Sequence, residues 1–251
     1  MTTQFYSNRA YVDMLINEAR VHRCVRHPYL KALADLSPGS IVDTLTDFGL
    51  HYYGYSAHFG RYLTATISRL ESLQHRQMLL DNIFEESGQY HETELQVLEQ
   101  NGIKPEWIVG IPHPLLFKRF RESLGIEGDI GINGVEVTCW REMFYNIIAY
   151  GSPAEAIGAI GIGTESITNL IYLDISSAIK KSGLPPDATV FFPLHCEVDD
   201  HHQAILKEIA IDLASTANGR FDLEKGMHKA LFLRSSFWDF LYTRLLNNLR
   251  K

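Results

Sequence analysis

The positions of proline, glycine and asparagine constrain the fold of this chain more than any other feature. Short breaks occur at Pro28, 37–39, 101–105, 112–114, 125–134, 151–153, 183–186 and 218–219. Between these breaks, apolar residues recur at helical spacing, and the few β-branched clusters, such as 135–138, run directly into helix-favouring sequence. No internal repeat or low-complexity segment is visible. We therefore expect one all-α domain over residues 1–251, a bundle of about seven or eight helices.

Composition narrows the classes of function. Hydrophobic residues make up 45% of the 251 positions, which is enough for a large core. The net charge of −7 is spread along the chain and argues against nucleic acid or an anionic membrane as the main partner. The three cysteines, Cys24, Cys139 and Cys196, form no C-x-x-C pair and are typical of reduced thiols. With no apolar leader at the start and no apolar stretch of about 18 residues, we expect a soluble, cytoplasmic protein.

The segment 195–202 carries the most informative polar pattern. His195, Asp199 and His202 are spaced i, i+4 and i+7, so on a helix they project from one stripe. Two imidazoles and a carboxylate without a thiolate suit iron or manganese better than structural zinc. The alternative is a solvated helix face. An apolar row on roughly the same face indicates instead that the three polar side chains point inward; it consists of Ala204, Ile205, Ile209, Ala210 and Leu213.

Two other segments contain carboxylates that could meet this stripe inside a helical bundle. In the first, Glu85 and Glu86 precede His91, with Gly88 between them. The second contains Glu165, which lies in an apolar, glycine-rich stretch. An unpaired buried carboxylate is costly, and a metal would compensate it. Pairing with an arginine, or an escape to solvent at the helix edge, remains the alternative for Glu165.

Taken together, these residues resemble the haem-oxygenase-like dimetal oxidases, and most closely the branch of the chlamydia protein associating with death domains. The resemblance spans roughly residues 22–245. It is carried by Asp47, His51-Tyr52, Tyr62-Leu63, Ile67-Ser68-Arg69, Leu79-Leu80-Asp81-Asn82, Glu85-Glu86, Gly88, His91, Thr164-Glu165-Ser166 and His195-x3-Asp199-x2-His202.

The resemblance implies a seven-helix, haem-free fold that holds two metal ions and activates O2. The ions are usually iron, with manganese or a mixed iron–manganese pair as alternatives, and relatives commonly form homodimers. Carried over by position, the ligands are Glu86, His91, Glu165, His195, Asp199 and His202. Because the chain is short between Asn82 and His91, counting back from Gly88 would select Glu85 in place of Glu86.

The resemblance also suggests a catalytic role for Tyr29. This residue matches a tyrosine that the chlamydial protein sacrifices to make para-aminobenzoate. The assisting lysine of that reaction corresponds to Ile175 here, so we do not expect self-sacrificing synthesis. Tyr29 remains a candidate pocket residue, or a plain core aromatic.

The function expected from these features is a non-haem dimetal oxidase or oxygenase that oxidises or cleaves a small organic substrate, such as an amino acid or fatty acid. Arg61, Arg69 and Arg141 are candidate anchors for a substrate carboxylate, and equally candidate surface charges. One alternative is a helical interaction protein with a structural metal or none. Another is a metal-free enzyme of the TenA type, for which Cys196 would be the nucleophile.

Overall fold

The computed structural model describes residues 6–128 and 134–249, except for the side chains of residues 198–201. The described chain is all-α, as expected, and contains no strand. Its elements are α1 (Asn8–Val21), α2 (Pro28–Asp35), α3 (Pro38–Ser56), α4 (Phe59–Arg69), α5 (Leu73–Met78), α6 (Leu80–Glu86), α7 (Glu92–Gln100), α8 (Pro105–Ile108), α9 (His113–Ser123), α10 (Val135–Tyr150), α11 (Pro153–Ile157), the π-helix η1 (Gly158–Glu165), α12 (Ser166–Ser182), α13 (Phe191–Leu213) and α14 (Ala217–Asn248).

These segments outnumber the seven or eight expected helices because several long helical runs are divided. Residues 153–182, for example, run through α11, η1 and α12 without a connecting loop. Where prolines start helices, as at Pro28, Pro38 and Pro153, the boundaries agree with the predicted breaks.

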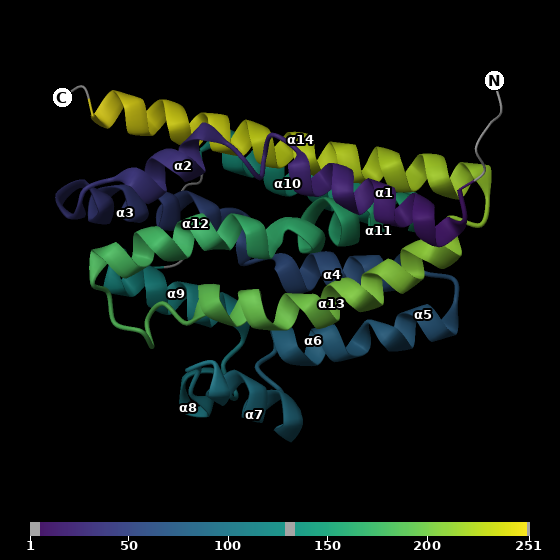
Figure 1. The fold of residues 1–251 in the computed structure, drawn as a ribbon, viewed down its shortest axis with the longest axis horizontal. Helices are drawn as coiled ribbons and strands as arrows, with labels where there is room; N and C mark the ends of the chain where they lie inside the picture. The colour runs from purple at the N-terminus through teal and green to yellow at the C-terminus, as the bar shows by residue number, and fades with distance from the viewer. Residues whose placement is uncertain (1–5, 129–133, 250–251) are drawn as a thin grey trace.

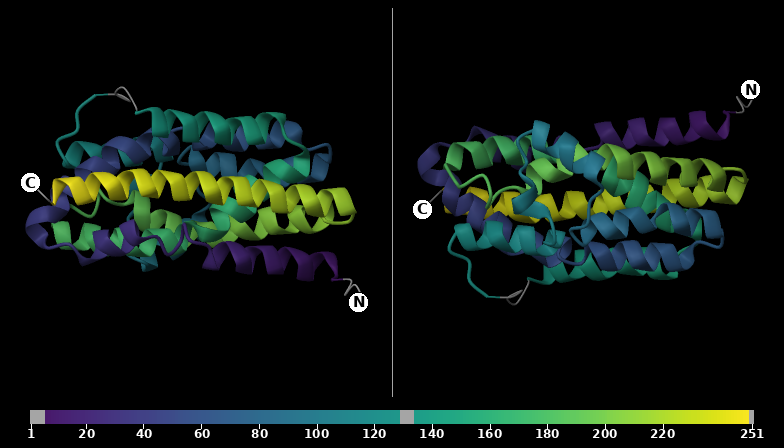
Figure 2. Two further views of the ribbon diagram at one scale, coloured as in Figure 1. Left: turned by 90° about the horizontal axis from the view of Figure 1, so that it is seen from above. Right: turned by 90° about the horizontal axis from the view of Figure 1, so that it is seen from below.

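The helices pack along one long axis (Figure 1). The last helix, α14, runs along almost the whole length of the molecule, as both views in Figure 2 show. α10, α11 and η1 pack against α14, and α12 packs against α13. The short helices α7 and α8 project from the body as a small lobe (Figure 1).

The run 153–182 is the one helix in the described chain that is long and apolar enough to cross a membrane by length and composition. Of its most apolar window, 83% is buried inside the molecule. Here the run packs as a central helix of the bundle, where a continuous apolar sequence is expected.

Glycines allow this central run to approach α14 closely. A Cβ added at Gly158 would lie 2.1 Å from the carbonyl oxygen of Leu223, and one at Gly163 would lie 2.7 Å from Cβ of Ala230. Because glycine has no Cβ, the backbones of η1 and α14 can lie in direct contact. Glu165 is the last residue of η1.

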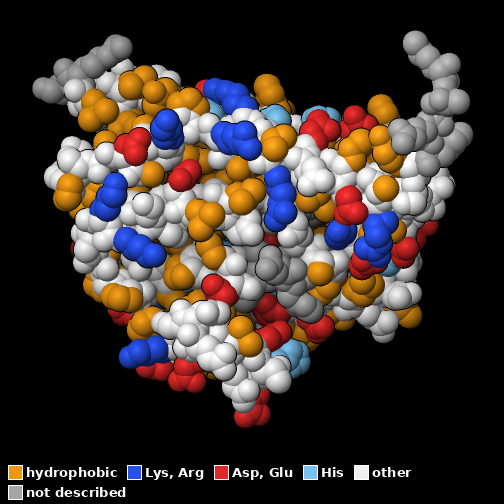
Figure 3. Space-filling view, in the orientation of Figure 1, with side chains coloured by type: hydrophobic (Ala, Val, Ile, Leu, Met, Phe, Trp, Pro, Cys, Tyr) orange, Lys and Arg blue, Asp and Glu red, His pale blue; other side chains and the backbone are white. Residues whose placement is uncertain are grey.

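On the face shown in Figure 3, positive and negative side chains are interspersed. The figure shows no large area of one sign on this face, in keeping with the spread of charge along the sequence.

Candidate metal centre

Three buried or half-buried side chains from separate helices converge inside the bundle. Glu86 ends α6, His113 begins α9, and His195 lies near the start of α13. One ligand atom from each of the three lies within 4.8 Å of the other two. Two imidazoles and one carboxylate are the donor set typical of non-haem iron.

The contact between Glu86 and His113 has a spacing that is compatible with metal ligation. Nδ1 of His113 lies 3.1 Å from Oε1 of Glu86. Nevertheless, this Nδ1 is buried and lacks a partner in hydrogen-bond geometry among the described residues. Two ligands bound at about 2.1 Å to one ion, at right angles, are separated by about 3 Å. The spacing of these two atoms is therefore one that two ligands of a shared cation would also have.

Neighbouring groups orient both imidazoles. The hydroxyl of Tyr90 is hydrogen-bonded to Nε2 of His113 at 2.8 Å. Nδ1 of His195 donates to the carbonyl oxygen of Phe191 at 2.7 Å. This leaves Nδ1 of His113 and Nε2 of His195 as the ligand atoms, and such outer contacts fix the tautomer and the ring orientation of metal-binding histidines.

The electrostatics of the cluster keep its donors ready to bind a cation. Burial opposes ionisation of Glu86, but His113, with His195 and His202 beyond it, lowers the pKa of this carboxyl to about 2. Burial and the neighbouring His113 lower the pKa of His195 to about 3. At neutral pH Glu86 is therefore an anion and His195 is neutral, which are the forms that bind metal.

Glu165 lies beside this cluster and is buried. Burial and the nearby Glu86 raise the pKa of Glu165, while His202 and Arg234 oppose that shift. Glu165 lines the same small cavity as the three converging donors. A carboxyl held near other carboxylates in an apolar site is one that a metal ion would stabilise in its ionised form.

His202 and Glu85 form a buried pair next to the cluster. Nε2 of His202 and Oε2 of Glu85 are 2.9 Å apart. Burial lowers the pKa of His202, but the contact with Glu85 outweighs it and the pKa is raised. Both residues of the Glu85-Glu86 pair therefore face histidines, Glu85 facing His202 and Glu86 facing His113.

The cavity that contains these donors is narrow, about 30 Å³ in volume. Its lining combines the four donors with aromatic and hydroxyl side chains. The residues are Tyr52, Tyr55, Ser56, Phe59, Glu86, His113, Thr164, Glu165, Thr168, Tyr172, Phe191, His195 and Arg234.

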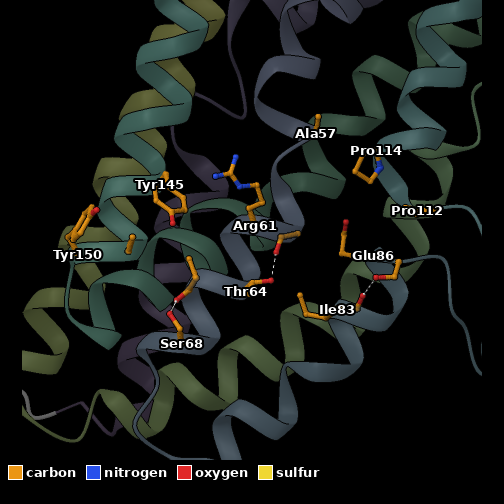
Figure 4. Close-up of a pocket in the computed structure, with 14 residues that line it drawn as sticks. Ala57, Arg61, Thr64, Ser68, Ile83, Glu86, Pro112, Pro114, Tyr145 and Tyr150 are labelled. Carbon is orange, nitrogen blue, oxygen red and sulfur yellow. Dashed lines mark hydrogen bonds between the residues drawn. The ribbon is translucent and has the colours of Figure 1, made fainter. Parts of the chain in front are cut away.

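Glu86 also lines a larger, open groove of about 810 Å³ between α4, α6, α9 and α10. In Figure 4, Glu86 and Pro112 lie on one side of this groove and Tyr145 on the other, with Arg61 between them. Glu86 is thus shared by the open groove and the inner cavity.

The structure brings together most of the predicted ligands. Glu86, Glu165 and His195 line one cavity, and His202 is buried next to it and paired with Glu85. Asp199 belongs to the α13 segment, one turn after His195, but its side chain lies outside the described part of the structure.

His91 does not join the other predicted ligands. It is exposed at the start of α7, where its backbone N–H donates to Glu94 at 2.7 Å. The chain leaves the body after Gly88 to form the α7–α8 lobe, and the lobe carries His91 to the surface. Within the described residues, the imidazoles that lie near Glu86 are those of His113 and His195, with His113 3.1 Å from its carboxylate.

Gly88 contacts the end of the α7–α8 lobe, where the chain returns to the body of the molecule. Its φ of +81° is left-handed, and a Cβ there would lie 2.5 Å from the backbone nitrogen of Ile111. The N–H of Gly110 donates to the carbonyl of Gly88 at 2.8 Å, which closes the lobe at its base. His113 follows directly, and its flanking prolines, Pro112 and Pro114, are the local sequence signal for a helix that begins there.

Tyr29 is buried but does not line the cavity. Its ring stacks on Trp238 at 5.6 Å, and burial raises the pKa of its hydroxyl. Its hydroxyl has no hydrogen-bond partner among the described residues. This environment is that of a core aromatic.

The three arginines considered as carboxylate anchors lie outside the cavity. Arg69 donates to the carbonyl oxygen of Gly151 at 3.0 Å, and Arg141 lies 3.6 Å from Glu142. Arg61 is exposed in the groove. The buried arginine that reaches the cavity is Arg234, which sequence reasoning missed.

Cys196 is next to His195 in sequence but lines a different pocket, together with Trp107 and Leu184. It is therefore not placed among the converging donors, and its position gives no support to a nucleophilic role in this cavity.

Comparisons with known proteins are consistent with this geometry. The model of a family described as iron-containing redox enzymes matches residues 46–235. The 4-chloro-allylglycine synthase of Streptantibioticus cattleyicolor is 24% identical over 237 residues, which cover 92% of this chain and 82% of that protein.

Solved structures with a similar fold include a CADD-like protein and a TenA homologue. A CADD-like protein of unknown function from Nostoc punctiforme has a TM-score of 0.71 and 15% identity, with 94% of this chain and 97% of that chain covered. A TenA homologue from Pseudomonas syringae has a TM-score of 0.67 and 15% identity, with 93% of both chains covered. At this identity the two likenesses concern the fold alone.

Proposed function

The chain belongs to the haem-oxygenase-like family of iron-containing redox enzymes, and on this premise we propose that it is a non-haem dimetal oxidase or oxygenase. In this proposal it uses O2 and two metal ions to oxidise or cleave a small organic molecule. We propose iron as the metal, with manganese as the alternative. The observation that carries the proposal is the convergence of Glu86, His113 and His195 in one buried cavity with Glu165. These donors fit iron by type and by spacing.

The donors divide into two groups in this proposal. Glu86, His113 and His195 would hold one ion, because their ligand atoms already lie within 4.8 Å of one another. Glu165 and His202 would hold the second, together with the Asp199 predicted from the sequence. Glu85, now paired with His202 at 2.9 Å, would either orient that imidazole or replace it as a ligand.

The chemistry that bound ferrous iron would supply at these residues is the binding and reduction of O2. The chain contributes orientation through Tyr90 and the Phe191 carbonyl, which hold the two imidazoles. The cavity hydroxyls of Thr164 and Thr168 donate to backbone carbonyls of Ala159 and Thr164. These two hydroxyls therefore have hydrogen-bond partners within the chain.

For the substrate we propose an amino acid or another small carboxylate, such as a fatty acid. The support is the name of the relative 4-chloro-allylglycine synthase, which denotes an amino acid product. The groove at Glu86 is the proposed approach to the centre, since it links the surface to one of its carboxylates.

The test is to purify the protein without oxygen, load it with ferrous iron and expose it to O2. We expect about two iron ions per chain, O2 consumption and a transient visible absorption. All three should be lost or strongly reduced in His195→Ala. Iron-loaded protein that consumes no O2 above the rate of free ferrous iron would overturn the proposal.

A further inference from the structure

Arg234 is a charged residue that the proposed chemistry does not use. It lies on α14, is only 2% exposed, and lines the cavity together with Glu165 and His195. A guanidinium stays charged even when it is buried, so its charge must be balanced by its surroundings.

The described partners of Arg234 do not balance this charge. Of its five N–H donors, one makes a long hydrogen bond, from Nη1 to the hydroxyl of Tyr52 at 3.4 Å. The guanidinium also lies over the rings of Tyr55 and Trp140, at 5.6 and 5.4 Å. Aromatic faces stabilise a cation but carry no net charge.

Another arginine on α14, Arg244, has its charge neutralised by a carboxylate and serves as a comparison. Arg244 makes short contacts to both carboxylate oxygens of Asp47, at 3.0 Å from Nε. No such carboxylate contact is made by Arg234 within the described residues. Glu165 is close enough for Arg234 to lower the pKa of its carboxyl, but the two form no ion pair there.

Neighbouring aromatic groups hold the guanidinium in place. The Tyr52 hydroxyl is hydrogen-bonded to that of Tyr172 at 3.0 Å, so both of these cavity tyrosines are fixed relative to Arg234. The Tyr55 ring in turn stacks on Trp140 at 3.8 Å. The result is a rigid, positively charged fork with unused donors beside the proposed metal centre.

We propose that Arg234 binds the carboxylate group of the substrate and thereby selects anionic substrates over neutral ones. The planar fork of a guanidinium matches the two oxygens of a carboxylate, and the missing counter-charge is then supplied by the substrate. This inference rests on the proposed function, because it places the substrate next to the oxidising centre.

A whole substrate needs more room than the roughly 30 Å³ of this narrow cavity. The junction between α3 and α4 separates the cavity from the open groove, since Ser56 and Phe59 line the cavity while Ala57 and Gly60 line the groove. We expect this junction to shift when substrate binds, so that the two spaces join.

The test uses butyrate and butyramide, which have nearly the same size and differ in charge. Binding to metal-free and iron-loaded protein is followed by tryptophan fluorescence, because Trp140 lies against the guanidinium. We expect wild type to bind butyrate at least about tenfold more tightly than butyramide in both forms. Arg234→Gln should remove this preference and Arg234→Lys should retain part of it.

Arg69→Gln is the control, because Arg69 is exposed and does not line the cavity. It should keep the preference for butyrate. Iron content is measured for every variant. An unchanged preference in Arg234→Gln would overturn the inference, as would a wild type that binds the two probes equally. Loss of iron together with an unchanged preference would show that Arg234 serves the metal site instead.

These results are distinguishable from failure of the proposed function. If the protein prefers butyrate through Arg234 but consumes no O2 when loaded with iron, the carboxylate site stands and the oxidase proposal fails. If Arg234→Gln does not fold, the wild-type comparison of the two probes and the Arg234→Lys variant still decide the question.

Discussion

At the scale of single residues, the positions of His113 and His91 predict that the same substitution, to alanine, lowers the iron content at one position and leaves it unchanged at the other. His113→Ala removes an imidazole whose Nδ1 lies 3.1 Å from Glu86, so we expect it to release at least one of the two bound metal ions. His91→Ala changes an exposed side chain and should leave iron content unchanged. Iron analysis after anaerobic reconstitution checks both. Retention of iron in His113→Ala with loss in His91→Ala would reverse the assignment.

The lowered pKa of His195 predicts that the stability of the metal-free protein depends on pH. Burial and His113 lower its pKa from 6.5 to about 3. Below about pH 6.5 the unfolded chain therefore binds a proton that the folded chain excludes. This contribution to the free energy of unfolding is fully present above that pH and falls as the pH drops, by at most about 1.4 kcal/mol per pH unit.

The corresponding experiment is urea unfolding of metal-free wild type and His195→Asn between about pH 7 and about pH 4.5. The variant lacks the His195 imidazole, so its stability should fall less steeply as the pH is lowered. Equal slopes for the two proteins would contradict the assigned pKa.

The sequence allowed part of this site to be predicted at the residue scale. His195 and His202 share a helix, so their spacing alone places them near one another. Glu165 is identified by its apolar surroundings. His113 and Arg234 could not be found in that way, because each reaches the site from a distant helix and no periodic pattern marks it.

At the scale of secondary structure, the π-helix η1 is the element that places Glu165. A π-helical turn changes which side chains face inward, and such turns are frequent at functional sites. Gly158 and Gly163 let this turn contact α14 directly. The sequence shows the glycines and the apolar run, but the π-helical hydrogen-bonding pattern depends on packing against α14 and cannot be read from periodicity.

This close approach predicts that Gly158→Ala is destabilising. The added Cβ would lie 2.1 Å from the Leu223 carbonyl oxygen, so the backbone of η1 or α14 must shift, at a cost of at least about 1–3 kcal/mol. Gly39→Ala is the matched control, since nothing lies within 4 Å of a Cβ there. Thermal unfolding of the metal-free proteins compares them. An unfolding temperature for Gly158→Ala equal to that of Gly39→Ala would contradict the packing.

Some of the helix boundaries could be predicted from the local sequence, whereas the α7–α8 lobe could not. Pro28, Pro38 and Pro153 start helices where the sequence predicts breaks, because proline is favoured in the first turn. The sequence did not predict that α7 and α8 form a separate lobe. It depends on the contact of Gly88 with Ile111, two residues far apart in the sequence.

At the scale of the whole molecule, the homodimer implied by the family resemblance remains a prediction. Met143, Tyr150 and Phe232 are large apolar side chains that are 53%, 78% and 69% exposed, and they line one pocket between α10 and α14. A second copy of the chain would cover this face. We expect sedimentation to show a dimer, and Phe232→Asp to shift it toward monomer. A monomeric wild type would contradict this prediction.

The central claim is that helices from distant parts of the chain build one iron centre inside the bundle. The most direct measurement is a crystal structure of the iron-loaded protein with data collected at the iron absorption edge. We predict two anomalous peaks in the cavity, one of them bound by Glu86, His113 and His195. Iron bound by His91, with His113 outside the coordination sphere, or no anomalous peak in the cavity, would contradict the account.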